Sequence, residues 1–385
     1  HVKVPERLAV PSRRASLDEV IAQHRIEAKP LPSLPLVFDI NLQEGSGLEQ
    51  NLEGYFRLCV EAEPMLVTLS NFAVWSRNGK TNGSAKVIPA VPLGHACGNM
   101  RPRVFFFDDN IETEGFESSP GICNLRDVTT GSFVDFGVGC NGFRSDSVAG
   151  HTVVHSSSKY RNVLVKVNIL DAMEDKNYFT KIVERFSEPG EKILVYMDIN
   201  SSILCADSVS DRGASSVLLS TLFEFFELRP RGKFEFKWED RPALEIGKAI
   251  SLKQIVKKIA KDAPDYYNHF YDLNNCLRFF AEVSKHGDVY WTSTGERMAA
   301  TDLKAAHGKY LEATASLSKQ GITKSWFHLF NHLQARGHSL VLNSFGIDAY
   351  AVVRETLPET DVSQLAVNYA MWEPRDVKKF EQSFA

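Results

Sequence analysis

Three apolar runs along the chain each end in acidic residues. They occupy residues 36–41 (LVFDIN), 103–110 (RVFFFDDN) and 193–200 (ILVYMDIN). Such runs are typical of buried strands, and the carboxyl ends of strands in open α/β sheets are where this class of fold binds ligands. Three acid-tipped strands therefore predict a metal and phosphate site at one edge of a sheet.

Further alternating or apolar segments predict more strands, with glycine-rich loops at 79–100 and 137–150. An amphipathic segment at 171–186, closed by Pro189 and Gly190, predicts a helix between two of these strands. A strand, a helix and a strand in succession indicate a parallel sheet of the Rossmann-like α/β class. The additional predicted strands are 65–69, 122–125, 133–136, 163–169 and 339–344.

The middle of the chain has helical periodicity. Helices are predicted at 213–227, 251–262, 265–285 and 302–335, with one alternating strand at 234–238. A block of this size between two strands of a sheet predicts a largely helical cap inserted above the strand ends. The predicted domains are an N-terminal arm (1–34), an α/β core (35–204 and 336–385) and the cap (205–335).

Composition narrows the class of protein. The 385 residues are 43% hydrophobic and carry a formal net charge of -4, which gives no overall attraction to nucleic acids or anionic membranes. The six cysteines are far apart and contain no C-x-x-C pair, so reduced thiols are expected. No apolar run reaches the roughly 20 residues of a membrane helix, and the first residues do not resemble a signal peptide. A cytoplasmic location with no membrane partner is expected, for a chain whose start lacks Met and suggests trimming.

The strand that ends at Asp198 carries the most specific chemistry. Asn200 and two serines follow the carboxylate in the next turn. A carboxylate fixed at a strand tip can attack phosphorus or bind Mg²⁺, because both tasks need a hard oxygen ligand in a constant position.

At these residues the chain resembles the haloacid dehalogenase-like superfamily. The motifs of that family include an apolar strand ending in Asp-x-Asp, a second ending in Ser or Thr, and a later one ending in paired acids. The resemblance implies that Asp198 is the nucleophile, with Asn200 as its catalytic neighbour, that Asn343 and Ser344 contact the phosphate, and that Asp108 and Asp109 hold Mg²⁺ with Asp198. Ser344 then belongs to the catalytic set.

The order of these motifs implies a circular permutation, because the paired acids precede the nucleophile. An arrangement in the family's usual order is the alternative. It uses Asp39 as the first acid, Thr68 or Ser70 as the hydroxyl, Lys80 or Lys86 as the cation, and again Asp108 and Asp109 as the paired acids. The permuted arrangement is favoured because residues 345–354 supply the helix expected after the second motif.

Both arrangements lack the second acid of the first motif. Asn200 or Asn41 stands there, and an amide cannot act as a proton donor and acceptor in place of a carboxyl group. The resemblance implies a phosphohydrolase or phosphotransferase that acts on a phosphorylated small molecule or phosphoprotein. A catalytically degenerate binding or scaffold protein with a protein partner is the alternative.

Simpler explanations exist for several of these residues. An Asp at a strand end often caps the following turn. His328 and His332 are four residues apart on a predicted helix, but their apolar neighbours favour a core helix over a metal site. The basic aromatic segment 229–238 and the lysines that follow are the best candidate for nucleic-acid contact, yet interleaved acids indicate an ordinary solvated edge. Nucleic acid is thus an unlikely partner.

Overall fold

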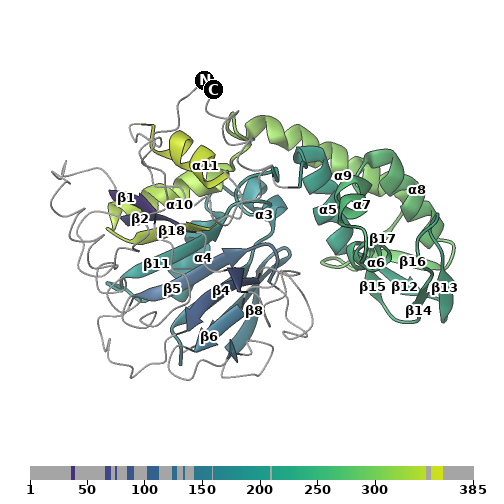
Figure 1. Cartoon of the computed structure of the whole chain (residues 1–385), viewed down its shortest axis with the longest axis horizontal. Coiled ribbons are helices and arrows are strands. Elements are labelled where there is room, and N and C mark those ends of the chain that lie inside the picture. Colours follow the sequence, from purple (N-terminus) through teal and green to yellow (C-terminus); the bar gives the residue numbers. More distant parts are fainter. Residues whose placement is uncertain are drawn as a thin grey trace, which may run out of the picture.

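The computed structural model describes residues 36–39, 66–70, 74–75, 85–90, 102–111, 124–127, 133–134, 143–157, 159–208, 210–343 and 348–358. Two bodies lie beside one another, a sheet domain and a smaller body formed by the middle of the chain (Figure 1). The predicted N-terminal arm at 1–34 lies outside the described residues. None of the helices in the described ranges combines the length and apolarity needed to cross a bilayer.

An eight-stranded mixed sheet organises the first body, in the order β1-β2-β18-β11-β5-β10-β9-β8. Neighbouring strands from β1 to β10 run parallel, whereas β9 and β8 are antiparallel. The chain is therefore an α/β protein, as predicted, although its sheet is not wholly parallel. The strands are β1 (Leu36–Asp39), β2 (Leu66–Ser70), β5 (Arg103–Asp108), β8 (Phe143–Ala149), β9 (Thr152–Ser157), β10 (Asn162–Lys166), β11 (Ile193–Asp198) and β18 (Ser339–Asn343).

The antiparallel edge was not predicted, because 137–150 was interpreted as a loop. Gly150 makes the reversal between β8 and β9 possible. Its φ of +47° is in the left-handed region, and a Cβ atom there would lie 2.5 Å from Asp171 Oδ1. The glycine signal was thus correct for a turn but hid the strands on either side of it.

A second, four-stranded sheet has the order β3-β4-β6-β7. Its strands are β3 (Val74–Trp75), β4 (Ala85–Ala90), β6 (Asn124–Asp127) and β7 (Phe133–Val134). The strand β4 occupies part of the stretch 79–100 that was predicted to be a loop.

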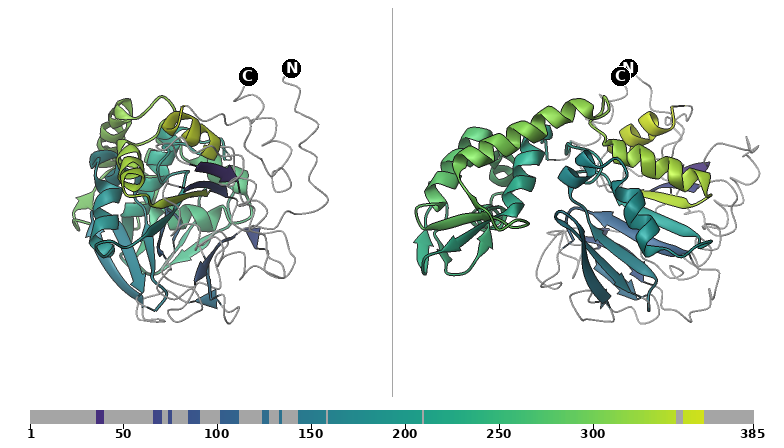
Figure 2. Two further views of the ribbon diagram at one scale, coloured as in Figure 1. Left: turned by 90° about the vertical axis from the view of Figure 1, so that its left-hand side faces the viewer. Right: turned by 180° about the vertical axis from the view of Figure 1, so that it is seen from behind.

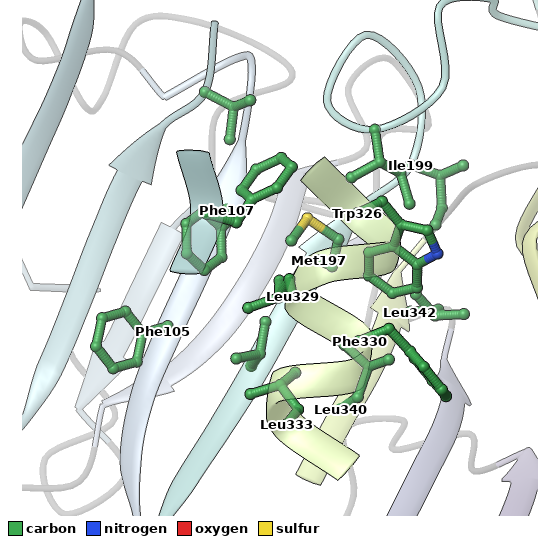
Figure 3. Packing of buried hydrophobic residues seen from close by; sticks show 14 of the residues in the cluster. Phe105, Phe107, Met197, Ile199, Trp326, Leu329, Phe330, Leu333, Leu340 and Leu342 are labelled. Carbon is green, nitrogen blue, oxygen red and sulfur yellow. The ribbon is translucent and has the colours of Figure 1, made fainter. Parts of the chain in front are cut away.

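Alternation along the central strands decides which side chains meet the helices. Phe105 and Phe107 on β5, like Val195 and Met197 on β11, are fully buried in one apolar cluster. Figure 3 shows Trp326, Leu329 and the neighbouring apolar residues of α10 (Lys324–Ala335) packed over these strands. The helices α3 (Ile169–Glu174), α4 (Tyr178–Phe186) and α11 (Asp348–Thr356) belong to the same body. Every other position of β5 and β11 is therefore fixed by packing.

The predicted helix at 171–186 is divided in two. Helix α3 ends at Glu174, and Asp175 follows in an extended conformation. The side chain of Asp175 accepts a hydrogen bond from the Asn177 backbone N–H and pairs with Lys181 at 2.6 Å. Local side-chain bonds of this kind compete with the helix, which explains the break.

Most of the residues between β11 and β18 form the second body, which has an apolar cluster of its own. It contains a four-stranded sheet, β15-β12-β16-β17, and the hairpin β13-β14, so the prediction of a largely helical insertion missed most of its strands. The strands are β12 (Phe226–Pro230), β13 (Phe234–Phe236), β14 (Leu244–Ile246), β15 (Ile250–Ser251), β16 (Gly287–Trp291) and β17 (Arg297–Met298); the helices are α5 (Ala214–Phe225), α6 (Leu252–Ile259), α7 (Pro264–Phe270), α8 (Leu273–Val283), α9 (Ala300–Ala313) and the 3₁₀ turn η4 (Thr314–Ser316).

Packing divides the two bodies at residues 205 and 321. Leu204 and Ile322 belong to the sheet-domain cluster, whereas Cys205 belongs to the second cluster. Helix α10 packs on the sheet, so the second body ends earlier than the predicted residue 335. We term residues 205–321 the insertion. The reverse view in Figure 2 shows it beside the sheet domain, with α9 extending toward α10.

Candidate metal and phosphate site

Backbone register brings the three sequence-predicted strand ends together. Asp198 lies opposite Asn343 in the β11–β18 pair, and Met197 lies opposite Phe107 in the β11–β5 pair. The next positions along β11 and β5 are Asp198 and Asp108. Because β5 and β11 are adjacent and parallel, both acids reach the same edge of the sheet.

The carboxylates of Asp108, Asp109 and Asp198 converge at this edge. One oxygen from each lies within 4.8 Å of the others. Asp108 is 1% exposed and Asp198 5% exposed, whereas Asp109 is partly exposed. Three converging carboxylates repel one another unless a cation offsets their charge.

Local hydrogen bonds orient the two buried carboxylates. The backbone N–H of Asn110 donates to Asp108 Oδ1 at 2.8 Å. The hydroxyl of Ser202 donates to Asp198 Oδ2 at 2.9 Å. A carboxylate has about four lone-pair sites, so a single hydrogen bond orients it without preventing it from binding a metal ion.

A tight turn follows Asp198 and supplies Ser202. The carbonyl of Ile199 accepts backbone hydrogen bonds from Ile203 at 3.1 Å and from Leu204 at 2.9 Å, while Ser201 has a φ of 60°. A non-glycine residue in the left-handed region is uncommon and is maintained here by the surrounding bonds. The turn therefore holds Ser202 beneath the Asp198 carboxylate.

This donor set fits a metal ion. It consists of carboxylate oxygens alone, which are the ligands that hard divalent cations such as Mg²⁺ prefer, with one carboxylate open to solvent. Two of the three are buried, so a bound cation would offset charge that water screens poorly. The geometry thus supports a metal site and leaves the identity of the metal open.

The remaining sequence-predicted residues fall in different places. Asn343 occupies the register position beside Asp198 on β18, and Ser344 lies outside the described residues. Asn200 lies in the turn after β11, where its Nδ2 donates to Asp207 Oδ1 at 3.3 Å. Asp39 is on β1, separated from β11 by β2 and β18, so it does not join the three acids. Of the alternative set, Thr68 and Ser70 lie on β2.

Lys86 lies on β4, in the other sheet of the first body. Asn41 and Lys80 are outside the described residues. Both arrangements share Asp108 and Asp109. Of the acids proposed as nucleophile, Asp198 lies in the cluster with them, whereas Asp39 does not.

A cation that sequence reasoning missed lies beside Asp108. Lys166, the last residue of β10, is the register partner of Asp108. Its Nζ is 2.5 Å from Glu224 Oε1 of the insertion, and Lys253 Nζ is 2.7 Å from the other oxygen of Glu224. No motif marks Lys166 in the sequence; only the pairing of β10 with β5 brings it to the site.

The electrostatics of this lysine–glutamate–lysine group keep Glu224 and Lys253 charged. Burial alone would raise the pKa of Glu224, but Lys253 and Lys166 together hold it far below its usual range. Burial alone would lower the pKa of Lys253, yet Glu224 raises it, with a smaller contribution from Asp109. The charge of Asp109, one of the three acids, thus acts on Lys253.

The other cation near Asp109 is Arg212, in the hairpin that opens the insertion. Its guanidinium pairs with Asp207 at 2.8 Å. Despite burial, Asp207 raises the pKa of Arg212, and Asp109 adds to the effect. The site edge therefore faces two cations of the insertion, Arg212 and Lys253, as well as Lys166 of the sheet.

The weaker candidates have structural explanations. His328 is exposed, and His332 Nδ1 accepts a hydrogen bond from Arg336 Nη1 at 2.7 Å, so the two histidines do not form a metal site. In the basic aromatic segment, Arg229 pairs with Glu227 and Arg231 with Asp288. Paired charges of this kind are typical of a solvated edge.

Comparison of the chain with protein-family models, with curated proteins and with solved structures found no match. The functional interpretation therefore rests on the geometry of the site.

Proposed function

We propose that the chain is a Mg²⁺-dependent phosphohydrolase or phosphotransferase that acts through Asp198, related to the haloacid dehalogenase-like superfamily by a circular permutation. The observation that carries the proposal is the convergence of Asp108, Asp109 and Asp198 within 4.8 Å at the carboxyl edge of parallel strands. The acids come from two strands far apart in the chain, so their meeting is a property of the fold.

Each side chain has a role that its position supports. Asp198 is the nucleophile toward phosphorus, and Ser202 keeps one of its oxygens occupied so that the other faces the substrate. Asp108 and Asp109 hold Mg²⁺ together with Asp198. The metal supplies charge neutralisation for the phosphoryl oxygens. Asn343 and Ser344 are the proposed phosphate contacts at the end of β18.

The insertion is the proposed cap. Its cations Arg212 and Lys253 lie close enough to Asp109 to be affected by its charge, which suits an anionic substrate bound between the two bodies. A phosphorylated small molecule or a phosphoprotein side chain fits this description. Lys166 is the candidate for the cation that offsets phosphate charge on the sheet side.

A binding or scaffold protein is the second candidate, and Asn200 is the observation that favours it. The residue two positions after the nucleophile is an amide, which cannot exchange a proton as a carboxyl group does. Such a protein would bind Mg²⁺ and phosphate without turnover.

Calorimetric titration of the full chain with Mg²⁺, with and without beryllium fluoride as a phosphate mimic, tests the site. Saturable Mg²⁺ binding that is tightened by beryllium fluoride is expected. Asp108→Ala and Asp198→Ala should each abolish both signals. Asp146→Ala, at an acid on the sheet-edge strand β8, is the matched control and should change neither.

Absence of Mg²⁺ binding in the parent chain would reject the site and leave the acids as caps of their strands. Binding without turnover of any phosphate ester would favour the scaffold protein over the enzyme.

A further inference from the structure

The side chain of Asn200 lies beside a pair of acids that sequence analysis did not connect to the site. Its Nδ2 is 3.3 Å from Asp207 Oδ1, and it also hydrogen-bonds to Asp348. Asp348 is the first residue of α11, five residues after the end of β18, and it is 7% exposed. Its Oδ2 accepts a hydrogen bond from the Ser208 hydroxyl at 2.7 Å.

These two acids have different electrostatic environments. Asp207 is buried, which opposes its charge, but its pairs with Arg212 and Ser210 lower its pKa below the usual range. Burial raises the pKa of Asp348, and the charge of Asp207 adds to this against the opposing bonds from Ser208 and Asn200. The groups that act on Asp348 in the described part of the chain are thus two hydrogen-bond donors and one acid. Asp207 therefore stays ionised, whereas Asp348 can hold a proton.

The other atoms of Asn200 show how the amide is oriented. Its Nδ2 faces the acids, and within the described part of the chain its Oδ1 is buried without a hydrogen-bond partner. A donor from a substrate or a water molecule would satisfy that oxygen. The amide thus links the turn after Asp198 to the acid pair without supplying a proton.

We propose that Asp348 is the catalytic acid and base of the phosphoryl transfer, taking the place of the carboxyl group that Asn200 lacks. The inference rests on the proposed function and deepens it. It stands on the position of Asp348 beside Asn200 at the carboxyl edge of the sheet, its burial and its bond to Ser208.

The proposed phosphoryl transfer has two steps. A carboxylate oxygen of Asp198 attacks phosphorus, the bond from phosphorus to the leaving oxygen breaks, and protonated Asp348 gives its proton to that oxygen. Water then attacks the aspartyl phosphate and loses a proton to the Asp348 carboxylate. The bond between Asp198 and phosphorus breaks, which releases phosphate and restores both acids.

Turnover of p-nitrophenyl phosphate with Mg²⁺ tests the role of Asp348, with binding of beryllium fluoride as a measure of an intact site. Asp348→Asn keeps the size of the residue and its ability to begin a helix. It should reduce turnover by about 10²- to 10⁴-fold, while beryllium fluoride binding is retained. It should also remove the acidic limb of the pH profile, where protonation of Asp348 prevents it from acting as the base. The groups facing Asp348 are Asn200, Ser208 and Asp207, and Asp207 stays ionised in this range.

Rescue separates a chemical role from a structural one. Adding Asn200→Asp to Asp348→Asn restores a carboxyl group at the same place and should recover at least about tenfold of the lost rate. Asp211→Asn, at an exposed acid of the neighbouring hairpin, is the control and should retain most of the turnover.

Unchanged turnover and pH profile in Asp348→Asn would overturn the assignment of Asp348 and leave the proposed function standing. Loss of beryllium fluoride binding in that variant, without rescue by Asn200→Asp, would also overturn it, because Asp348 would then only hold the fold. A parent chain that binds beryllium fluoride but turns over no ester would reject the hydrolytic function together with this inference.

Discussion

The sheet domain and the insertion are stabilised in different ways, and only one of them positions the acids. In the sheet domain, β11 is hydrogen-bonded on both sides, to β18 and β5, so the backbone fixes the height of each strand end. The insertion instead has an aromatic core, with Phe270 and Phe279 packed edge to face at 5.2 Å between ring centroids. Strand register therefore places the acids of the sheet domain precisely, whereas side-chain packing determines the shape and surface of the insertion.

The two bodies meet through apolar, aromatic and charged side chains. Ile169 and Leu170 of α3 are buried in the apolar cluster of the insertion. His151, at the β8–β9 turn, stacks on Phe225 with ring centroids 3.7 Å apart and contacts Trp291. Lys166 reaches Glu224 from β10. We therefore expect substitutions at the strand ends to alter catalysis and substitutions in either core to alter stability. Substitutions at the seam, the contact between the two bodies, should alter how the bodies close.

The largest expected effect is on chemistry. Asp198→Asn should reduce turnover by at least about 10³-fold, because the amide is a poor nucleophile and a poor metal ligand. Circular dichroism and the melting temperature should remain close to those of the parent. Asp146→Asn should leave turnover unchanged, and full activity in Asp198→Asn would reject the nucleophile.

A matched pair of core truncations should distinguish the two bodies. Phe279→Ala in the insertion and Leu329→Ala on α10 should each lower the free energy of unfolding by about 3 to 4 kcal/mol, because both side chains are fully buried. Mg²⁺ binding should survive in Phe279→Ala at temperatures where the sheet domain stays folded. Loss of Mg²⁺ binding in that variant alone would show that the insertion helps to assemble the acids.

Glu224→Gln should weaken the seam. It leaves Lys166 and Lys253 without their shared partner, at a cost of about 2 kcal/mol for partly buried pairs. The folded-state pKa of Glu224 is lowered, so its contribution is complete above about pH 4.5 and is lost as the pH falls further. Urea unfolding from pH 7 to pH 3 should show this loss in the parent and not in the variant.

A smaller effect is expected at His151. Burial lowers its pKa from 6.5 to about 4, so the unfolded chain binds a proton that the folded chain rejects. This group therefore destabilises the fold progressively as the pH falls from about 6.5 to about 4, by about 2 kcal/mol. His151→Phe preserves the ring and should flatten that part of the stability profile; an unchanged slope would show that His151 does not titrate at the seam.

The sequence identified the acid cluster because its signal is local. Each apolar run ends in its own acid, so β5 and β11 and their carboxylates could be predicted without knowledge of the fold. Alternation at 234–238 predicted β13, but most other strands of the insertion were missed because they are short; β14, for example, has three residues. Short strands depend on distant partners more than on their own pattern.

Lys166 and Asp348 were beyond the reach of sequence patterns for the same reason. Lys166 becomes relevant only through the pairing of β10 with β5. Asp348 follows β18 in the chain and meets Asn200 only because β18 is adjacent to β11. The break in the predicted helix 265–285 did have a local signal, because Asp272 accepts hydrogen bonds from the backbone N–H groups of Asn274 and Asn275.

The chain leaves the sheet domain and returns to it at one place. The Cys205 backbone N–H donates to the Gly321 carbonyl at 3.0 Å, and the Thr323 N–H donates to the Ile203 carbonyl at 2.9 Å. The chain thus enters and leaves the insertion through one pair of hydrogen-bonded segments. A gene lacking the insertion needs only a short turn to join the two ends, which makes this junction the natural point for exchanging one such insertion for another during evolution or engineering.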